Sequence, residues 1–337
     1  MTTKNKEIIL SVKDLKTYFY TEEGTVKAVD GLSFEVHKGE FVGLVGESGC
    51  GKSVSAMSLL RLIPYPPGII VNGEIIFKGE DLRSVSEERI RSIRGDRIAM
   101  VFQEPTTSLN PVLTVGRQIS ESLEIHRQLD KSEAMKESKR LIDLVGIPDA
   151  NQRVKDYPHQ FSGGMQQRIM IAMALSCNPE LLIADEPTTS LDVTVQAQLL
   201  EIIAGLRSEL DMAVIVITHN LGLVARYVDR VNVMYAGKLV EAGPTDTIFA
   251  SPQHPYTIGL LASVPRLDSK RKITPKVIDG LPPNLAHLPP GCSFAPRCSY
   301  AMDKCHTEKP ELESVGADHL RTCFYDPSKL KPSAVEV

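Results

Sequence analysis

The residues with the clearest chemical potential form a glycine-rich segment that begins at Gly46. It fits the pattern G-x-x-x-x-G-K-[ST], follows the apolar run 41–45 and opens a helical pattern. Glycines let the backbone curl so that N–H groups face phosphate oxygens, and the helix start adds partial positive charge. Lys52 is expected to reach β- and γ-phosphates, and the Ser53 hydroxyl to bind Mg²⁺. The predicted phosphate-binding residues are Gly46, Glu47, Ser48, Gly49, Cys50, Gly51, Lys52 and Ser53.

A pair of carboxylates follows a second apolar run. The run 181–184 predicts a buried strand that ends in Asp185 and Glu186. Asp185 is expected to hold the Mg²⁺ shell, directly or through water, and Glu186 to polarise an attacking water. His219 follows a further apolar run, and the ends of neighbouring parallel strands meet where ligands bind. We therefore expect a functional rather than a structural role for His219.

Two glycines at another predicted helix start form a second segment that can contact an anion. The sequence there is Phe161-Ser162-Gly163-Gly164-Met165, and a helical pattern runs over 163–176. Exposed N–H groups at a helix start attract an anion, and Ser162 adds a hydroxyl donor.

The elements that must position these residues alternate between strands and helices, which favours an α/β fold with a mostly parallel sheet. Early antiparallel strands predict an additional β piece, and a hairpin is predicted over 69–77 with Asn72-Gly73 at its turn. The expected strands are 8–15, 26–36 with a break near Asp30-Gly31, 41–45, 181–184 and 213–217. The expected helices fill most of 86–157, including 115–127 and 131–145, and then 163–176.

Length and composition indicate a main domain with an appendage. The chain has 337 residues, more than one core usually supports, and its net charge of −4 argues against a nucleic-acid partner. No apolar run approaches the roughly 20 residues of a spanning helix, and the first residues lack a secretory signal, so a cytoplasmic chain is expected. Ten of the 22 prolines fall in 256–337, which places the predicted domain boundary there, between 1–255 and 256–337.

The ordered motifs resemble the ATP-binding-cassette ATPases over about residues 7–255. The motifs in question are Gly46–Ser53, Gln103, Ser162-Gly163-Gly164, Asp185-Glu186, Asp192 and His219. The resemblance implies a cassette with a RecA-like parallel sheet core, an antiparallel β piece and a helical subdomain at about 87–165. It also implies Mg²⁺-dependent ATP hydrolysis by two cassettes paired head to tail, with Ser162, Gly163 and Gly164 directed at the ATP of the partner.

The same resemblance assigns roles to single residues. Glu186 is the expected base, His219 the switch histidine, and Asp192 lies in the D-loop. Gln103 is the Q-loop residue that joins the γ-phosphate site to a membrane partner, and it would share the Mg²⁺ with Ser53 and Asp185. Phe19 is expected to stack on adenine, with its neighbours Tyr18 and Tyr20 as competing choices. The family's usual Leu-Ser-Gly-Gly-Gln is replaced by Phe161 to Met165, which removes a glutamine side chain from the last position.

Two further segments resemble the dipeptide/oligopeptide importer branch, most closely its D-type ATPase subunit. They are Gln103–Pro111, and His254–Thr257 with the tail that follows. The resemblance implies a peripheral protein on the cytoplasmic face of the membrane. Its implied partners are two permease subunits, a second homologous ATPase and an extracytoplasmic peptide-binding protein, with a homodimer as the state in isolation. The alternatives are import of another small solute such as nickel, an exporter, and a soluble cassette ATPase acting on ribosomes or DNA.

Four cysteines crowd into the tail, and they are Cys292, Cys298, Cys305 and Cys323. Their C-x5-C-x6-C-x17-C spacing fits a structural zinc site poorly, and a reducing compartment disfavours disulfides. Burial of separate thiols and a redox-sensing module remain alternatives. Four thiolates from irregular loops suit an iron–sulfur cluster, and some members of the resembled branch carry a [4Fe–4S] cluster in this extension. The sequence therefore predicts a [4Fe–4S] cluster on these four residues, structural before redox-active.

Overall fold

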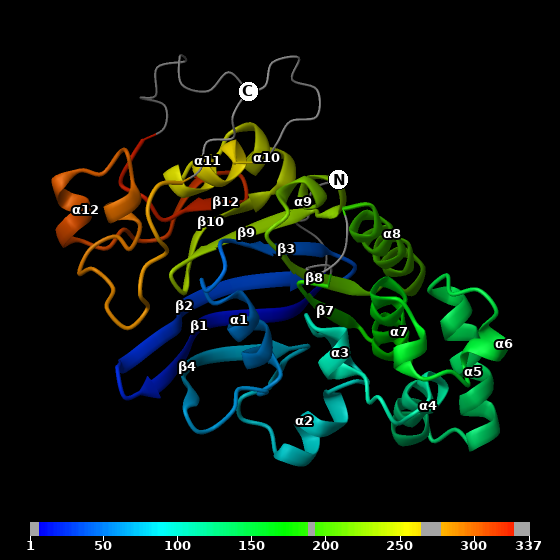
Figure 1. Cartoon of the computed structure of the whole chain (residues 1–337). Helices are drawn as coiled ribbons and strands as arrows, with labels where there is room; N and C mark the ends of the chain where they lie inside the picture. The colour runs from blue at the N-terminus through cyan, green and yellow to red at the C-terminus, as the bar shows by residue number, and fades with distance from the viewer. Residues whose placement is uncertain (1–6, 188–192, 264–277, 327–337) are drawn as a thin grey trace, which may run out of the picture. The chain divides into compact units, whose positions relative to one another are not determined.

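A computed structural model describes residues 7–187, 193–263 and 278–326 of the chain (Figure 1). The chain forms two compact units. The first contains residues 1–10, 35–42 and 76–218, and the second contains residues 11–34, 43–75 and 219–337.

The sheet of the first unit is parallel, as the sequence predicts. Strand β6 (Ile98–Val101) pairs with β7 (Leu181–Asp185), and β7 pairs with β8 (Ala213–Thr218). Every residue of β7 and β8 is buried, as is typical of parallel strands covered on both faces. The short strand β6 lies inside the stretch predicted to be mainly helical, because a four-residue apolar run carries no distinguishing period.

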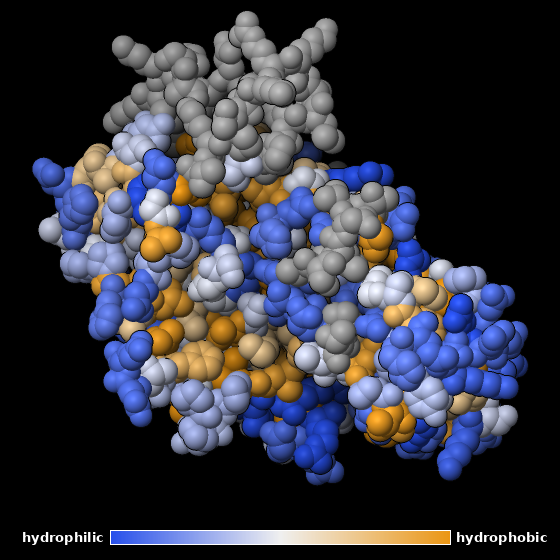
Figure 2. All heavy atoms as spheres, in the orientation of Figure 1, coloured by the Kyte–Doolittle hydropathy of each residue, from blue (hydrophilic) through white to orange (hydrophobic). Residues whose placement is uncertain are grey.

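Several helices of the first unit pack around α7 (Gly163–Leu175), the helix whose N-cap is Ser162. Helix α4 (Val115–His126) is capped by Thr114, and α5 (Lys131–Leu144) begins with a capping box of Asp130 and Glu133. Both helices end one residue before the predicted position. They pack on one another and on α7. The other helical segments of this unit are α2 (Glu87–Ile93), α3 (Pro105–Ser108), α6 (Ala150–Arg153), η2 (Pro158–Gln160) and α8 (Val193–Leu210). Figure 2 shows hydrophilic surface over α2, which has acidic side chains in its first turn and a basic side chain in its last turn.

The N-terminal strands are longer than predicted. Strands β1 (Ile8–Thr21), β2 (Gly24–His37) and β4 (Gly68–Phe77) are neighbours in the order β2-β1-β4, and β5 (Glu80–Asp81) pairs with the end of β4. The predicted break in β2 is wrong, because the strand continues through Gly31.

The hairpin predicted over 69–77 is also wrong, because β4 runs through Asn72-Gly73 without reversing. Gly73 adopts φ 105°, and the Asn72 side chain donates a hydrogen bond of 2.7 Å to Asp14 on β1. A Cβ at position 73 would lie 2.6 Å from the Cα of Leu15. The glycine therefore serves a close approach between two strands, and not a turn.

The C-terminal part of the second unit contains antiparallel strands. Strand β9 (Arg230–Tyr235) forms a hairpin with β10 (Lys238–Pro244), and β12 (His319–Arg321) pairs with β10 on its other side. Strand β11 (Glu313–Gly316) completes the edge. The intervening helical segments are α9 (Leu221–Tyr227), α10 (Thr245–Ala250), α11 (Pro255–Ala262), η3 (Ala295–Arg297) and α12 (Asp303–Thr307). The C-terminal extension, residues 256–337, is thus irregular over much of its described length but joins the sheet through β12.

A buried carboxylate anchors this arrangement. Glu241 on β10 is 0% exposed. Its oxygens accept hydrogen bonds from the backbone N–H groups of Gln253 and His254 at 2.6 and 2.9 Å, and Oε1 lies 2.8 Å from Nε2 of His319 on β12. Because a buried charge is stable only when it is hydrogen-bonded, these contacts hold β12 and the start of α11 in place. None of the helices in the described ranges is long and apolar enough to cross a membrane.

Candidate functional site

The glycine-rich segment forms the predicted strand–loop–helix. Strand β3 (Phe41–Val45) leads into the phosphate loop, Gly46–Ser53, and α1 (Lys52–Leu59) begins inside it. Gly46 and Gly51 have φ angles of 155° and 105°, and a Cβ on either would clash with a backbone carbonyl oxygen. Only glycine satisfies both demands, the left-handed backbone and the close approach.

Lys52 closes the phosphate loop on itself. Its side chain is 4% exposed, and Nζ donates to the carbonyl oxygens of Gly46 and Glu47, each at 2.9 Å. The ammonium group therefore lies against the loop, within reach of an anion held by the N–H groups. Cys50 is buried against Gly46, and burial raises the pKa of its thiol.

The three aromatic residues near the end of β1 differ in their surroundings. Tyr18 donates a hydrogen bond from its hydroxyl to Asp30 at 2.7 Å, and Tyr20 is 57% exposed. Phe19 points to the opposite face of the strand, is half-buried and lies close to Gly68. Phe19 thus has an apolar setting, and its stacking on adenine stays a prediction.

The two carboxylates after β7 have different environments. Asp185 is 5% exposed, whereas Glu186 is half-buried, with φ 41° and its N–H donating to the Ile217 carbonyl at 3.0 Å. Gln103, just after β6, donates from Nε2 to Oε2 of Glu186 at 3.1 Å. The structure thus joins the predicted Q-loop residue to the predicted base.

The predicted Mg²⁺ ligands have suitable chemistry. Mg²⁺ prefers oxygen ligands such as hydroxyl, amide and carboxylate groups. Ser53 supplies a hydroxyl at the start of α1 and Asp185 a carboxylate at the end of β7. Because Gln103 uses Nε2 toward Glu186, its Oε1 is the atom suited to a cation. The donor set therefore fits the ion.

The segment predicted to face a partner's ATP is exposed at a helix start. Ser162 and Gly163 are exposed, and Ser162 is the N-cap of α7, accepting from Met165 N at 3.4 Å. Phe161 is buried, where its ring contacts the Arg153 guanidinium. His219 directly follows β8 and is exposed. Asp192 lies outside the described residues.

The four tail cysteines lie close to one another. Cys292 N–H donates to the Cys305 carbonyl at 2.8 Å. Burial first, and nearby thiols second, raise the pKa of Cys298 and of Cys323 to about 11 each. Across the described part of the chain, no three or more His, Cys, Asp or Glu side chains are grouped so as to hold a metal ion. Four cysteine thiols are the donor set that suits a [4Fe–4S] cluster, and the cluster stays a prediction.

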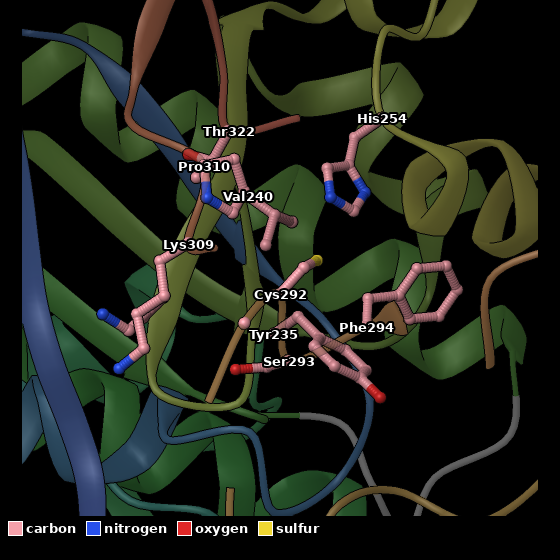
Figure 3. A pocket seen from close by; sticks show the side chains of 11 residues that line it. Tyr235, Val240, His254, Cys292, Ser293, Phe294, Lys309, Pro310 and Thr322 are labelled. Atoms are coloured by element: carbon pink, nitrogen blue, oxygen red, sulfur yellow. The ribbon is translucent and has the colours of Figure 1, made fainter. Parts of the chain in front are cut away.

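A small cavity of about 50 Å³ lies beside these cysteines (Figure 3). Cys292 and the imidazole of His254 both face it, with Tyr235 and Phe294 on its wall. Nδ1 of His254 accepts from Tyr256 N at 3.0 Å, so Nε2 carries the proton, and within the described residues Nε2 has no hydrogen-bond partner. Of the four tail cysteines only Cys292 is among the residues that line this cavity.

Within the described part of the C-terminal extension, Tyr256 and Arg297 touch the phosphate loop, and sequence reasoning missed both. The Glu47 N–H donates to the Tyr256 hydroxyl at 2.8 Å. The Glu47 carboxylate pairs with Arg297 at 2.6 Å. The partners are 209 and 250 positions apart in the chain, so no local pattern signals them.

Comparison with known proteins places the chain in a family. A family model described as "ABC transporter" matches residues 29–189, and one described as "Oligopeptide/dipeptide transporter, C-terminal region" matches residues 240–305. The dipeptide transport ATP-binding protein DppD of Bacillus subtilis is 52% identical over 94% of this chain and 95% of its own length. The oligopeptide transport ATP-binding protein OppD of the same organism is 50% identical over 92% and 87%.

The solved structures agree with this assignment. The dimeric bacterial ABC transporter cassette MJ0796 superposes with a TM-score of 0.63 at 25% identity, covering 70% of this chain and 98% of its own. With the loop, the paired carboxylates and the C-terminal region all matched, the chain belongs to the ABC transporter ATP-binding proteins, in the group that carries the oligopeptide/dipeptide transporter C-terminal region.

Proposed function

We propose that this chain is the ATP-hydrolysing subunit that powers import of di- or oligopeptides by an ABC transporter. The observation that carries the proposal is the match to dipeptide and oligopeptide transport ATP-binding proteins at about half identity along nearly the whole chain. It includes the C-terminal region, beyond the part common to ABC transporters in general.

The arrangement of side chains supports Mg·ATP hydrolysis. The phosphate loop and Lys52 bind and orient the phosphates. Mg²⁺, when bound by the oxygen ligands, would neutralise the negative charge that develops on the phosphate oxygens. Glu186 accepts the proton of the attacking water, with its carboxylate oriented by Gln103. His219 and the exposed start of α7 complete the site when two cassettes pair. The D-loop role of Asp192 stays a prediction. Pairing would exclude water, and opening after hydrolysis would reset the transporter.

The segment after Gln103 is suited to receive a permease helix. Phe102, directly before Gln103, is 41% exposed, and Val112 within the segment is 76% exposed, so apolar side chains face outward around this stretch. Gln118 braces the stretch from α4, accepting from Asn110 N and donating to the carbonyls of Asn110 and Leu113. A docked helix would thereby be connected to Glu186 through Gln103. Crosslinks from position 112 are expected to reach a membrane protein.

The remaining assignments follow from the same role. The cassette would occupy 1–255, with its helical subdomain at about 87–165, and 256–337 would be the extension. The partners would be two permease subunits, a second homologous ATPase and an extracytoplasmic peptide-binding protein. The chain would work as a peripheral protein on the cytoplasmic face of the membrane.

The decisive experiment measures ATPase activity of the complete assembly. The chain is purified with its permeases and second ATPase in lipid, and the peptide-binding protein is added with dipeptides, longer peptides or Ni²⁺. Stimulation by peptides and not by Ni²⁺ is expected. Stimulation by Ni²⁺ alone would assign the nickel-importer role, and an ATPase that never co-purifies with membrane proteins would reject transport.

The [4Fe–4S] cluster on Cys292, Cys298, Cys305 and Cys323 stays a separate prediction. Its support is the Cys₄ donor set and the proximity of the thiols, whose pKa values respond to one another. Anaerobic purification should give a brown protein with about four irons and four sulfides per chain, lost on Cys298→Ser. A colourless preparation with stoichiometric zinc would reject the cluster.

A further inference from the structure

The second residue of the phosphate loop is held at every polar group. Glu47 donates its N–H to Tyr256, and its carbonyl oxygen accepts from Lys52 Nζ. Its carboxylate accepts two hydrogen bonds from Arg297, at 2.6 Å from one guanidinium nitrogen and 2.9 Å from the other. A loop residue with this many partners is held in one conformation.

Arg297 is itself fixed in place. Nε donates to the carbonyl of Asp279 at 3.0 Å, and one Nη donates to the carbonyl of Ile278 at 3.3 Å. The other Nη also donates to the Tyr235 hydroxyl at 3.4 Å. With the two bonds to Glu47, all the guanidinium donors are used, and the side chain is only 6% exposed. Such a bidentate, buried pair has the geometry of a strong charge-assisted contact.

The support behind Arg297 is an aromatic cluster. The guanidinium lies 5.9 Å from the centre of the Tyr235 ring. The Tyr235 ring contacts Tyr256 and Phe294, with ring centres 4.6 and 5.1 Å away (Figure 3 labels Tyr235 and Phe294). Tyr256 is therefore both a member of the cluster and a partner of the Glu47 N–H. The cluster joins β9, α11 and the turn η3 into one support for the loop.

The charge of Glu47 makes this support necessary. A carboxylate in a loop that binds phosphates repels the ligand unless a cation neutralises it. The Glu47 side chain is about a quarter exposed and carries the only carboxylate of the loop. Arg297 compensates that charge, and the carbonyls of Asp279 and Ile278 hold its guanidinium in place.

We propose that Arg297 is a positioning residue of the nucleotide site: it neutralises Glu47 and holds it in place, so that the C-terminal extension sets the affinity of the phosphate loop for Mg·ATP. The inference rests on the proposed ATP-binding function. It assigns the extension a task inside its own chain, separate from the cysteines.

The test is titration of the full-length chain with Mg·ATP. Arg297→Met keeps much of the side-chain volume and removes the charge, and Kd should rise about tenfold, equivalent to about 1.4 kcal/mol. Because the loss is repulsion by an unpaired carboxylate, adding Glu47→Gln to Arg297→Met should restore Kd to near the wild-type value. The effect of Arg297→Met should also shrink as KCl is raised. The matched control is Arg321→Met, which breaks the Arg321–Glu313 pair elsewhere in the extension and should leave Kd unchanged.

Each outcome decides the matter. Arg297→Met with wild-type affinity overturns the inference, and so does a double variant as weak as Arg297→Met, which would mean a purely structural role. If Arg297→Met fails to fold, Arg297→Lys carries the test, since it keeps the charge but loses the fork, and it should raise Kd less than loss of charge would. A wild-type chain that does not bind Mg·ATP would instead overturn the proposed function, because the variants would then have nothing to change.

Discussion

Gln103 donates a hydrogen bond from Nε2 to Oε2 of Glu186 at 3.1 Å. The two residues follow neighbouring parallel strands, β6 and β7, so the pairing of those strands sets the distance between them. One side of this contact continues into the exposed segment proposed to meet a permease, and the other is the proposed base. A displacement of the segment after Gln103 would therefore change the orientation of the Glu186 carboxylate.

Glu186→Gln should bind Mg·ATP normally but hydrolyse it at least about a hundredfold more slowly, because an amide cannot accept the proton of water. Phosphate release under saturating ATP measures the effect, and gel filtration should show a persistent ATP-bound pair. Glu201→Gln, at an exposed position on α8, is the control and should behave as wild type. Normal turnover in Glu186→Gln would show that Glu186 is not the base.

Lys52→Ala should weaken Mg·ATP binding by about tenfold or more, because the charge that meets the phosphates is lost. The loop also loses the two 2.9 Å hydrogen bonds to Gly46 and Glu47. Lys38→Ala serves as the comparison, since it removes an exposed lysine that pairs with Asp211. Titration with both variants separates a local effect from a general loss of positive charge, and equal affinities would contradict the assigned role of Lys52.

Ser162→Ala should strongly lower the ATPase activity of the assembled transporter but should lower the free energy of unfolding only slightly. The cap hydrogen bond to Met165 is long, at 3.4 Å, so its loss should cost only about 0.5 kcal/mol. Thr114→Ala removes a comparable 3.3 Å cap from α4 and should cost a similar amount without the loss of activity. Denaturant unfolding and ATPase assays on both variants test this, and parallel losses would reduce Ser162 to a helix cap.

Acid should destabilise the protein partly through His254. Burial, with a smaller contribution from Arg321, lowers the pKa of His254 from 6.5 to about 3. A folded-state pKa below the unfolded value means that this contribution is complete above pH 6.5 and is lost as the pH falls toward 3. His254→Asn keeps an acceptor for Tyr256 N but does not titrate, so its unfolding free energy should fall less steeply over that range.

The comparison isolates His254 because the neighbouring groups stay the same. Glu241, His319 and Arg321 surround the site and are present in both proteins. Urea unfolding at a series of pH values between 3 and 7 gives the two slopes. Identical slopes would show that His254 does not contribute to acid sensitivity.

Elements whose signals are local could be predicted from the sequence. The phosphate loop was predictable because its eight residues are consecutive in the chain. Its glycines, lysine and serine therefore appear in the sequence at a fixed spacing. Helices α4 and α5 were predicted to within one residue at their ends, since Thr114 and the Asp130–Glu133 capping box mark the starts in the sequence. The branch of the family could also be predicted, because each segment that carries the resemblance is continuous in the chain.

Contacts between segments far apart in the chain appear only in the folded structure. The sequence predicts a turn at Gly73. In the structure β4 continues through it, and the glycine is needed because the backbone of Leu15 lies close beside it. Strand β12 forms by pairing with the edge of β10, and His319 at its start contacts the buried Glu241. A run of three residues carries no signal for either contact. The Glu47–Arg297 pair spans 250 positions, and two charged residues carry no signal of which partner they will meet. Pairing of that kind depends on the packing of Tyr235, Tyr256 and Phe294, which is settled only when the whole unit has folded.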